Sequence, residues 1–184
     1  MLIGNRVRLR GIDKSDLAAF VRWLNDPEVR CHLDILAPLS MGQEENWYAD
    51  MLSQPAIAQP LGIEINDGGS WVLIGDTSFM NINQIDRNAE VGIFIGEKQF
   101  WDQGYGSEAL QLMLKYGFET LNFHRIYLRV YETNPRGVRC YQKIGFTEEG
   151  RMRNHHYLEG KYIDVIIMGI LKNEWFKQTN GGAT

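Results

Sequence analysis

The stretch FWDQGYGSEALQLMLKYGFE, residues 100–119, places two glycines directly before a helical pattern of apolar residues. Glycine lets the chain turn sharply and leaves backbone N–H groups uncovered, as expected at Gly104 and Gly106. The first turn of a helix adds unpaired N–H donors and the positive end of the helix dipole. The stretch therefore indicates either a plain tight turn or a backbone seat for a diphosphate.

Two common phosphate motifs fit this stretch poorly. Residues 104–109 formally match the dinucleotide fingerprint GxGxxG/A, and Glu132 follows the next predicted strand at a suitable distance. However, eight residues, 96–103, separate the preceding strand from Gly104, where a dinucleotide fold needs a tight turn. A Walker A loop is excluded because the stretch has no Gly-Lys-Ser/Thr. A third carrier of a diphosphate is coenzyme A.

The rest of the chain alternates between strand and helix patterns. The helix expected from Ser40 has Trp47, Met51 and Leu52 as its predicted inner face. The turn residues NDGG, 66–69, join two runs of alternating apolar residues and predict a hairpin. Strands are predicted over 6–10, 61–65, 71–82, 89–95 and 125–130 and on both sides of residues 158–161, and helices over about 15–24, 40–54, 105–121 and 137–143. This order of elements predicts a mixed α/β (α+β) fold.

The length and composition of the chain limit the number of domains, the partners and the location that we expect. A chain of 184 residues with 44% hydrophobic and 23% charged residues fits one domain, predicted over residues 1–178 with a disordered tail at 179–184. The net charge of −4 argues against a nucleic-acid binder with a broad basic face. No apolar run is long enough for a membrane span, and the N-terminal residues do not resemble a signal peptide. We therefore expect a cytoplasmic protein without a membrane partner.

The cysteines and histidines give no metal signature. Two widely spaced cysteines, Cys31 and Cys140, form neither a disulfide framework nor a zinc pattern. The four histidines lack the spacing of metal ligands, so no metal site is predicted.

Two motifs in sequence order resemble one family. FWDQGYGSEAL, residues 100–110, resembles the acyl-CoA-binding motif of the GNAT superfamily of N-acetyltransferases, Gln/Arg-x-x-Gly-x-Gly/Ala, although Trp101 replaces the usual Gln or Arg. NPRGVRCYQKIGF, residues 134–146, is similar to a second family motif, with Gly137 in place of Ala or Ser. The residues FW..GYG.EA of the first motif, and the C-terminal stretch 146–171, resemble the branch of ribosomal-protein alanine N-acetyltransferases. The resemblance implies a mostly antiparallel, twisted sheet of about seven strands, flanked by helices, with a splayed central strand pair.

The same resemblance implies direct transfer of an acetyl group from acetyl-CoA, a co-substrate, to an amine. The backbone N–H groups of Gln103, Gly104, Tyr105, Gly106 and Ser107 would bind the diphosphate. The strand edge at residues 92–95, which includes Phe94 and Ile95, would pair with the pantetheine amides. Asn134 would contact the pantetheine arm, cap the following helix, or do both.

Two residues are candidates for proton transfer. Tyr141 of the second motif would protonate the departing thiolate, and its alternative role is that of an amphipathic core residue. Glu90 begins the strand expected beside the reacting centre and would take a proton from the amine. Its alternative role is that of a solvent-facing strand residue.

The acceptor amine stays open at this point. The main hypothesis is a primary amine such as a protein N-terminus. Polyamines, aminoglycoside-like molecules and amino acids are alternatives within the same chemistry. A non-catalytic acyl-CoA-binding protein and a nicotinamide-dependent oxidoreductase are hypotheses from other classes. Relatives in the family often dimerise through their C-terminal strands, so a homodimer is also expected.

Overall fold

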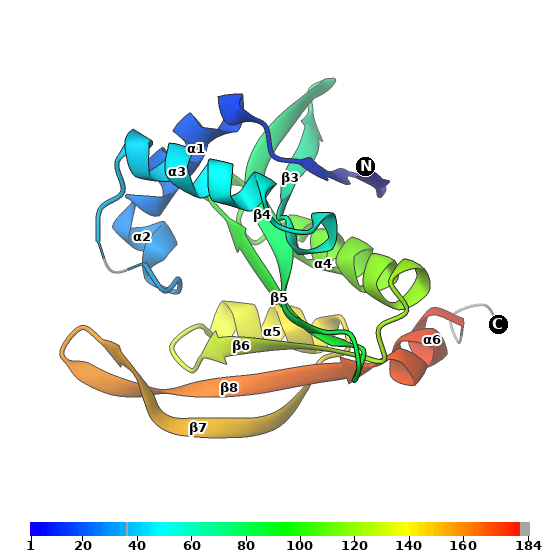
Figure 1. Cartoon of the computed structure of the whole chain (residues 1–184). Helices are drawn as coiled ribbons and strands as arrows, with labels where there is room; N and C mark the ends of the chain where they lie inside the picture. Colours follow the sequence, from blue (N-terminus) through cyan, green and yellow to red (C-terminus); the bar gives the residue numbers. More distant parts are fainter. Residues whose placement is uncertain (36, 181–184) are drawn as a thin grey trace. The chain divides into compact units, whose positions relative to one another are not determined.

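The computed structural model describes residues 1–35 and 37–180 of the chain. Figure 1 shows a mixed α/β architecture in which helices flank a sheet. The described residues contain eight strands: β1 Leu2–Ile3, β2 Val7–Gly11, β3 Leu61–Asp67, β4 Ser70–Asn83, β5 Asn88–Ile95, β6 Arg125–Tyr131, β7 Thr147–Leu158 and β8 Lys161–Leu171. The α-helices are α1 Leu17–Leu24, α2 Pro27–Arg30, α3 Met41–Leu52, α4 Tyr105–Lys115, α5 Pro135–Lys143 and α6 Lys172–Asn180. The predicted fold class is therefore confirmed, with β1 as the additional strand.

The strands form one sheet in the order β1-β2-β3-β4-β5-β6-β8-β7. The pairs β1–β2, β2–β3, β3–β4, β6–β8 and β7–β8 are antiparallel, whereas β5 and β6 run parallel. The parallel ladder has three residue pairs, from Asn88 with Arg125 to Glu90 with Tyr127. In contrast, β6 pairs with β8 along its whole length, from Arg125 to Tyr131. A ladder this short is what the predicted splay of the central pair requires.

The chain divides into two compact units. The first unit comprises residues 1–79 and 92–112, and the second comprises residues 80–91 and the chain from 113 onward. Strands β4 and β5 and helix α4 contribute residues to both units. The prediction of a single domain over residues 1–178 stays a prediction.

The first unit is built around β2, β3 and β4, with α1 and α3 beside them. Each element begins where its local residues favour it. Ser40 caps α3 and accepts a hydrogen bond from the backbone N–H of Gln43, as expected of an N-cap serine. Gly68 and Gly69 supply the positive φ angles, +61° and +92°, that the two-residue turn between β3 and β4 needs. The apolar cluster of this unit comprises buried Ile12, Phe20, Trp23, Val29 and Met51.

The predicted inner face of α3 needs a correction. Met51 is buried as expected, but Trp47 is 37% exposed and Leu52 is 53% exposed. The residues that face inward are Glu44, which is buried, and Tyr48, which packs against the apolar cluster with Met51. These three positions are spaced i, i+4 and i+7 and lie on one face of the helix. A charged residue therefore occupies a position where the apolar pattern does not predict one.

The second unit is formed mainly by β6, β8 and β7, with α5 and α6. Asn134 and Pro135 begin α5, and the N-cap side chain accepts a hydrogen bond from the backbone N–H of Gly137 at 2.9 Å. Helix α6 follows β8 and was not predicted. It includes residues 179 and 180 of the predicted tail, whereas residues 181–184 lie outside the described residues.

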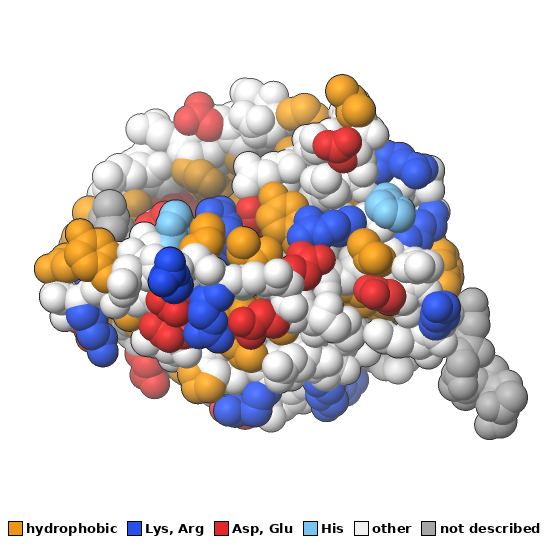
Figure 2. Space-filling model, turned by 90° about the horizontal axis from the view of Figure 1, so that it is seen from below, with side chains coloured by type: hydrophobic (Ala, Val, Ile, Leu, Met, Phe, Trp, Pro, Cys, Tyr) orange, Lys and Arg blue, Asp and Glu red, His pale blue; other side chains and the backbone are white. Residues whose placement is uncertain are grey.

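On the face shown in Figure 2, Lys and Arg side chains are interspersed with Asp and Glu side chains, without a broad area of one sign. Within the described ranges, no helix combines the length and the apolar character needed to cross a membrane.

Candidate active site

The turn before α4 has the geometry that its glycines predict. Gly104 has a φ of +84°, a left-handed conformation that glycine adopts without the penalty of a side chain. The first intrahelical hydrogen bond runs from the backbone N–H of Glu108 to the carbonyl of Gly104 at 3.0 Å. Gly104 is thus the N-cap, and the N–H groups of the next two residues, Tyr105 and Gly106, have no acceptor within the helix. They are the donors available to an anion at this helix end.

A cation lies beside this turn. The Arg6 guanidinium donates a hydrogen bond from Nη1 to the carbonyl of Gln103 at 3.2 Å, and it lies 4.7 Å from the ring centre of Tyr105. Its Nε is 3.1 Å from Oε2 of Glu108. The other carboxylate oxygen, Oε1, accepts hydrogen bonds from the backbone N–H groups of Arg6 and Val7. Because the Arg6 side chain is 52% exposed, it is accessible to a ligand at the turn. The turn therefore combines backbone donors with a positive side chain.

Arg6 was missed in the sequence because it lies far from the motif along the chain. Its hydrogen bond to Gln103 spans 97 positions, and the alternating pattern of residues 6–10 indicates only a strand. No local signal in the sequence links the two segments.

Trp101 explains the departure from the family motif. Its indole Nε1 donates a hydrogen bond to the carbonyl of Ile95 at 2.8 Å, which ties the loop to the end of β5. Trp101 also packs against the apolar cluster of the first unit, as does Phe94. A second hydrogen bond holds the start of the loop, because the N–H of Gly96 donates to the carbonyl of Ile74 on β4 at 2.7 Å. The Trp101 side chain thus holds the loop that leads to Gly104.

The strand edge predicted to pair with pantetheine is partly engaged within the protein. The carbonyl of Gly92 accepts a hydrogen bond from Oγ1 of Thr77 at 2.8 Å, and that of Ile95 accepts the bond from Trp101. A carbonyl oxygen has two lone pairs, so each can accept one further bond. The role of Phe94 and Ile95 in cofactor binding stays a prediction.

Glu90 is held in an ion pair. It is 5% exposed, and Arg129 donates from Nε to its Oε1 at 2.8 Å. Asn81 donates to its Oε2, also at 2.8 Å. Both carboxylate oxygens therefore have a partner, and the hydrogen bond with Glu90 raises the pKa of Arg129. Glu90 is not the solvent-facing residue of the alternative reading, and its role as a base stays a prediction that these contacts disfavour.

Tyr141 keeps a protonated hydroxyl. Its ring packs edge-on against Phe146, with ring centres 6.1 Å apart. No described residue makes a hydrogen bond to its hydroxyl. Burial, reinforced by the neighbouring Cys140, raises the pKa of this phenol above its usual value. The hydroxyl is therefore a proton donor at neutral pH, as a general acid must be.

Asn134 acts as the cap of α5, one of its two predicted roles. Its Oδ1 accepts the N–H of Gly137, and a Cβ at Gly137 would stand 2.9 Å from Nδ2 of Asn134. Glycine in place of the usual Ala or Ser therefore leaves room for the asparagine side chain. The Nδ2 group is not used by the cap, and a contact of Asn134 with pantetheine stays a prediction.

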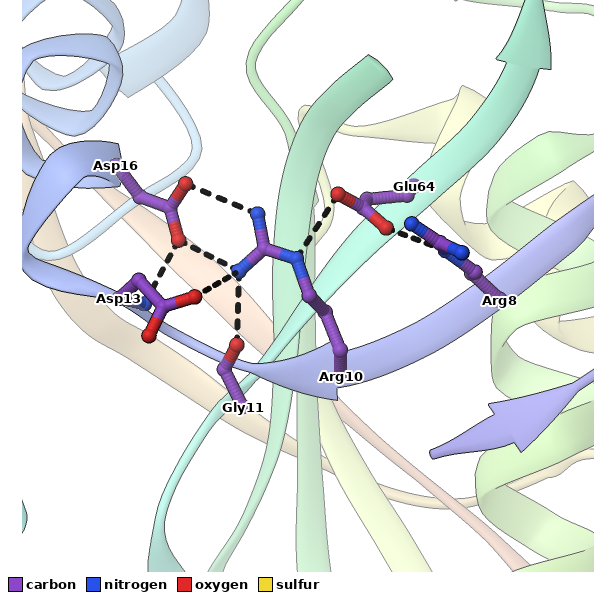
Figure 3. Close-up of polar contacts among 6 residues, drawn as sticks. All are labelled: Arg8, Arg10, Gly11, Asp13, Asp16 and Glu64. Carbon is purple, nitrogen blue, oxygen red and sulfur yellow. Dashed lines mark hydrogen bonds and ion pairs between the residues drawn. The ribbon is translucent and has the colours of Figure 1, made fainter. Parts of the chain in front are cut away.

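Charged side chains also pair on one face of the first unit. Glu64, buried on β3, accepts hydrogen bonds from Arg8 at 2.5 Å and from Arg10 at 2.9 Å. Arg10 also bonds both oxygens of Asp16, as Figure 3 shows. Burial opposes ionisation of Asp16, but the hydrogen bonds from Arg10 prevail and lower its pKa. Among the described residues, no group of three or more His, Cys, Asp and Glu side chains could hold a metal.

A donor-lined helix start and a short parallel strand pair in a mostly antiparallel sheet fit the class that the two motifs resemble, the CoA-dependent acyltransferases. A family model described as an acetyltransferase (GNAT) domain matches residues 6–147, so the chain belongs to the GNAT acetyltransferases. It is an acetyl-CoA-dependent N-acetyltransferase. The predicted family, activity and co-substrate are thereby confirmed.

Three similar proteins set this chain in context. An uncharacterized N-acetyltransferase p20 of Bacillus licheniformis is 28% identical over 95% of this chain and 97% of its own length. A spermidine N(1)-acetyltransferase of Vibrio cholerae is 36% identical over 58% of this chain and 61% of its own length. The crystal structure of a spermidine N-acetyltransferase from Vibrio cholerae in complex with CoA and spermine superposes with a TM-score of 0.84. The two proteins are 28% identical in sequence, and the match covers 94% of this chain and 99% of the Vibrio cholerae chain.

Proposed function

We propose that the acceptor is a small cationic amine of the polyamine class, rather than a protein N-terminus. The observation that carries this proposal is the likeness to the spermidine N-acetyltransferase of Vibrio cholerae, which extends over 94% of the chain. The net charge of −4 gives weak additional support because it favours the approach of a cation. This reverses the order of preference that the sequence motifs alone suggested.

We further propose that the turn at residues 103–107 binds the diphosphate of acetyl-CoA. The backbone donors of Tyr105 and Gly106 and the guanidinium of Arg6 supply hydrogen bonds and positive charge. The Arg6 side chain is 52% exposed, so a phosphate group at the turn could approach it. Pantetheine would pair with the strand edge at residues 92–95, as the family motifs imply.

The chemical step has two proton transfers. The amine nitrogen attacks the thioester carbonyl carbon, the carbon–sulfur bond breaks, and coenzyme A leaves as a thiolate. Tyr141 donates its proton to the sulfur and then recovers a proton from solvent. The attacking nitrogen loses its surplus protons to water or to a carboxylate. For Glu90 to be that carboxylate, its hydrogen bond with Arg129 or Asn81 must first break.

The test is a thiol-release assay with acetyl-CoA and a panel of acceptors. The panel contains spermidine, spermine, an aminoglycoside and a short peptide with a free N-terminus. We expect thiol release with the polyamines and little with the peptide. Release with the peptide alone would restore the protein N-terminus as the acceptor. Binding of CoA without release for any amine would instead support a non-catalytic acyl-CoA-binding protein.

We also propose that the protein forms a homodimer through its C-terminal strands. Strand β7 is at the edge of the sheet, and Tyr157 and Tyr162 of the β7–β8 hairpin are exposed. An exposed edge with aromatic side chains favours pairing with another chain. Light scattering should report twice the mass of 21.2 kDa, and a monomer mass at micromolar concentration would refute this proposal.

A further inference from the structure

The segment of residues 94–97 leads from one proposed part of the cofactor site to the other. Residues 92–95 form the strand edge for pantetheine, and residues 103–107 form the turn for the diphosphate. Coenzyme A carries both groups in one molecule, so the two parts must lie at the distance that the cofactor spans. The contacts of residues 94–97 therefore bear on how the cofactor is bound.

Strand β4 approaches this segment closely from one side. Ile74 is the extra residue of a β-bulge in the pairing of β4 with β3. Its carbonyl accepts hydrogen bonds from the backbone N–H groups of Gly96 at 2.7 Å and Glu97 at 3.1 Å. The next residue, Gly75, lies against the carbonyl of Phe94, and a Cβ on Gly75 would overlap that oxygen. A larger residue at position 75 would therefore push the end of β5 away from β4.

Helix α1 holds the same segment through the Trp23 indole. The ring lies against Gly96, where an added Cβ would overlap it. The indole Nε1 donates a hydrogen bond to Oε1 of Glu97 at 3.0 Å, and Arg22 forms an ion pair with the same oxygen. Trp23 is 2% exposed and belongs to the apolar cluster of the first unit, so the ring is itself held in place. Both α1 and β4 thus fix the segment.

The hydrogen bond from Trp23 is the stronger of the two side-chain contacts of Glu97. The Arg22 side chain is 62% exposed, and an ion pair at such a surface contributes little in water. The indole N–H belongs to a buried ring, and a buried donor that loses its acceptor keeps the full cost of its desolvation. Loss of the Glu97 acceptor should therefore displace the ring or the segment.

We propose that Trp23 and Glu97 are positioning residues that set the distance between the pantetheine edge and the diphosphate turn before coenzyme A binds. This inference rests on the proposed location of the cofactor. Trp101 supports the same arrangement, because it ties the later part of the loop to Ile95. A fixed distance favours a ligand that engages both parts at once, since less of the loop has to be ordered on binding. It gives no such advantage to a ligand that engages the turn alone.

The experiment compares the binding of coenzyme A with that of its nucleotide half, 3′-phosphoadenosine 5′-diphosphate, by titration calorimetry. The main variant is Glu97→Ala, which removes the acceptor for the Trp23 indole. CoA affinity should fall about 5- to 30-fold, as for loss of one hydrogen bond to a charged group at a partly exposed site. Affinity for the nucleotide half should change by less than about 3-fold. Trp23→Phe, which removes the N–H and keeps an aromatic ring, should give the same pattern.

Two matched controls separate the hydrogen bond from the charges around it. Glu97→Gln keeps an oxygen that can accept from Trp23 and removes the charge that pairs with Arg22, so CoA affinity should stay within about 3-fold of wild type. Glu28→Gln removes an exposed ion pair with Lys98, which joins α2 to the same loop. It should change both affinities by less than about 2-fold.

Three outcomes would overturn the positioning role. They are an unchanged CoA affinity in Glu97→Ala, equal losses for coenzyme A and its nucleotide half, and a loss in Glu97→Gln as large as that in Glu97→Ala. Urea unfolding of each variant shows whether the folded state persists under the conditions of the titration. If Gly106→Val binds CoA as tightly as wild type, the proposed location of the diphosphate fails instead, which is a distinguishable result.

Discussion

Replacement of Gly106 by valine tests the cofactor turn directly. Gly106 is the second residue of α4, and its N–H is one of the donors without an acceptor in the helix. A Cβ at this position would meet Ile95 at 3.7 Å and Ile93 at 4.0 Å, which are ordinary van der Waals distances. The protein therefore tolerates the first added carbon. A bound diphosphate would not, because the added methyl groups lie against the same N–H.

The expected magnitude follows from the loss of one hydrogen bond to a charged group. Such a bond contributes about 1.5–3 kcal/mol, so CoA affinity should fall about 10- to 150-fold. The free energy of unfolding should change by less than about 1 kcal/mol, because valine and glycine differ little in helix propensity. The affinity is measured by titration calorimetry with CoA, and the stability by urea unfolding.

Gly42→Val is the matched control for this variant. Gly42 occupies the same second position of a helix, α3, and a Cβ there would meet no atom within 4 Å. It should change CoA affinity by less than about 2-fold, since a surface change of this kind is nearly neutral. If Gly106→Val binds CoA as tightly as the wild-type protein, the turn does not hold the diphosphate.

Three further predictions concern the remaining polar residues. Tyr141→Phe should lower kcat about 10²- to 10⁴-fold with little change in CoA affinity, and an unchanged rate in the thiol assay would remove Tyr141 from the mechanism. Glu90→Gln should destabilise the protein by about 1–3 kcal/mol in urea unfolding because it leaves Arg129 without its partner, whereas lost turnover with unchanged stability would instead support a base. Asp76→Asn should alter the pH dependence of stability. Burial, reinforced by the charge of Glu44, raises the pKa of Asp76 on β4 to about 7 in the folded state, so the contribution of this carboxyl to stability is present below the unfolded value and is lost as pH rises through about 7. Relative to wild type, the free energy of unfolding of the variant should therefore rise by about 1–2 kcal/mol between pH 5 and pH 8, as measured by thermal or urea unfolding. This figure allows for the partial exposure of the Asp76 carboxyl. An unchanged difference between variant and wild type would contradict the burial of its charge.

Several local features could be predicted because a few consecutive residues control them. The left-handed φ of Gly104 and the start of α4 follow from the glycine turn. The cap of α5 follows from Asn134 and Pro135, and the hairpin between β3 and β4 follows from residues 66–69. The two motifs with their spacing were sufficient to identify the family.

The inner face of α3 shows where apolar periodicity misleads. Trp47 and Leu52 are apolar yet exposed, and Glu44 is charged yet buried. Hydrophobic pattern assigns faces by residue type, but the neighbouring strands decide which face is covered. No short segment contains both the helix and these strands.

The sequence by itself determined the family, the co-substrate and the donor turn at Gly104, because these depend on backbone preferences within short segments. Only the tertiary structure decided which charges meet. Arg6 reaches Gln103 across 97 positions, and Arg129 reaches Glu90 across 39. Such contacts are set by which strands and helices become neighbours, and a charge is neutralised by whichever partner the fold brings within a few ångströms.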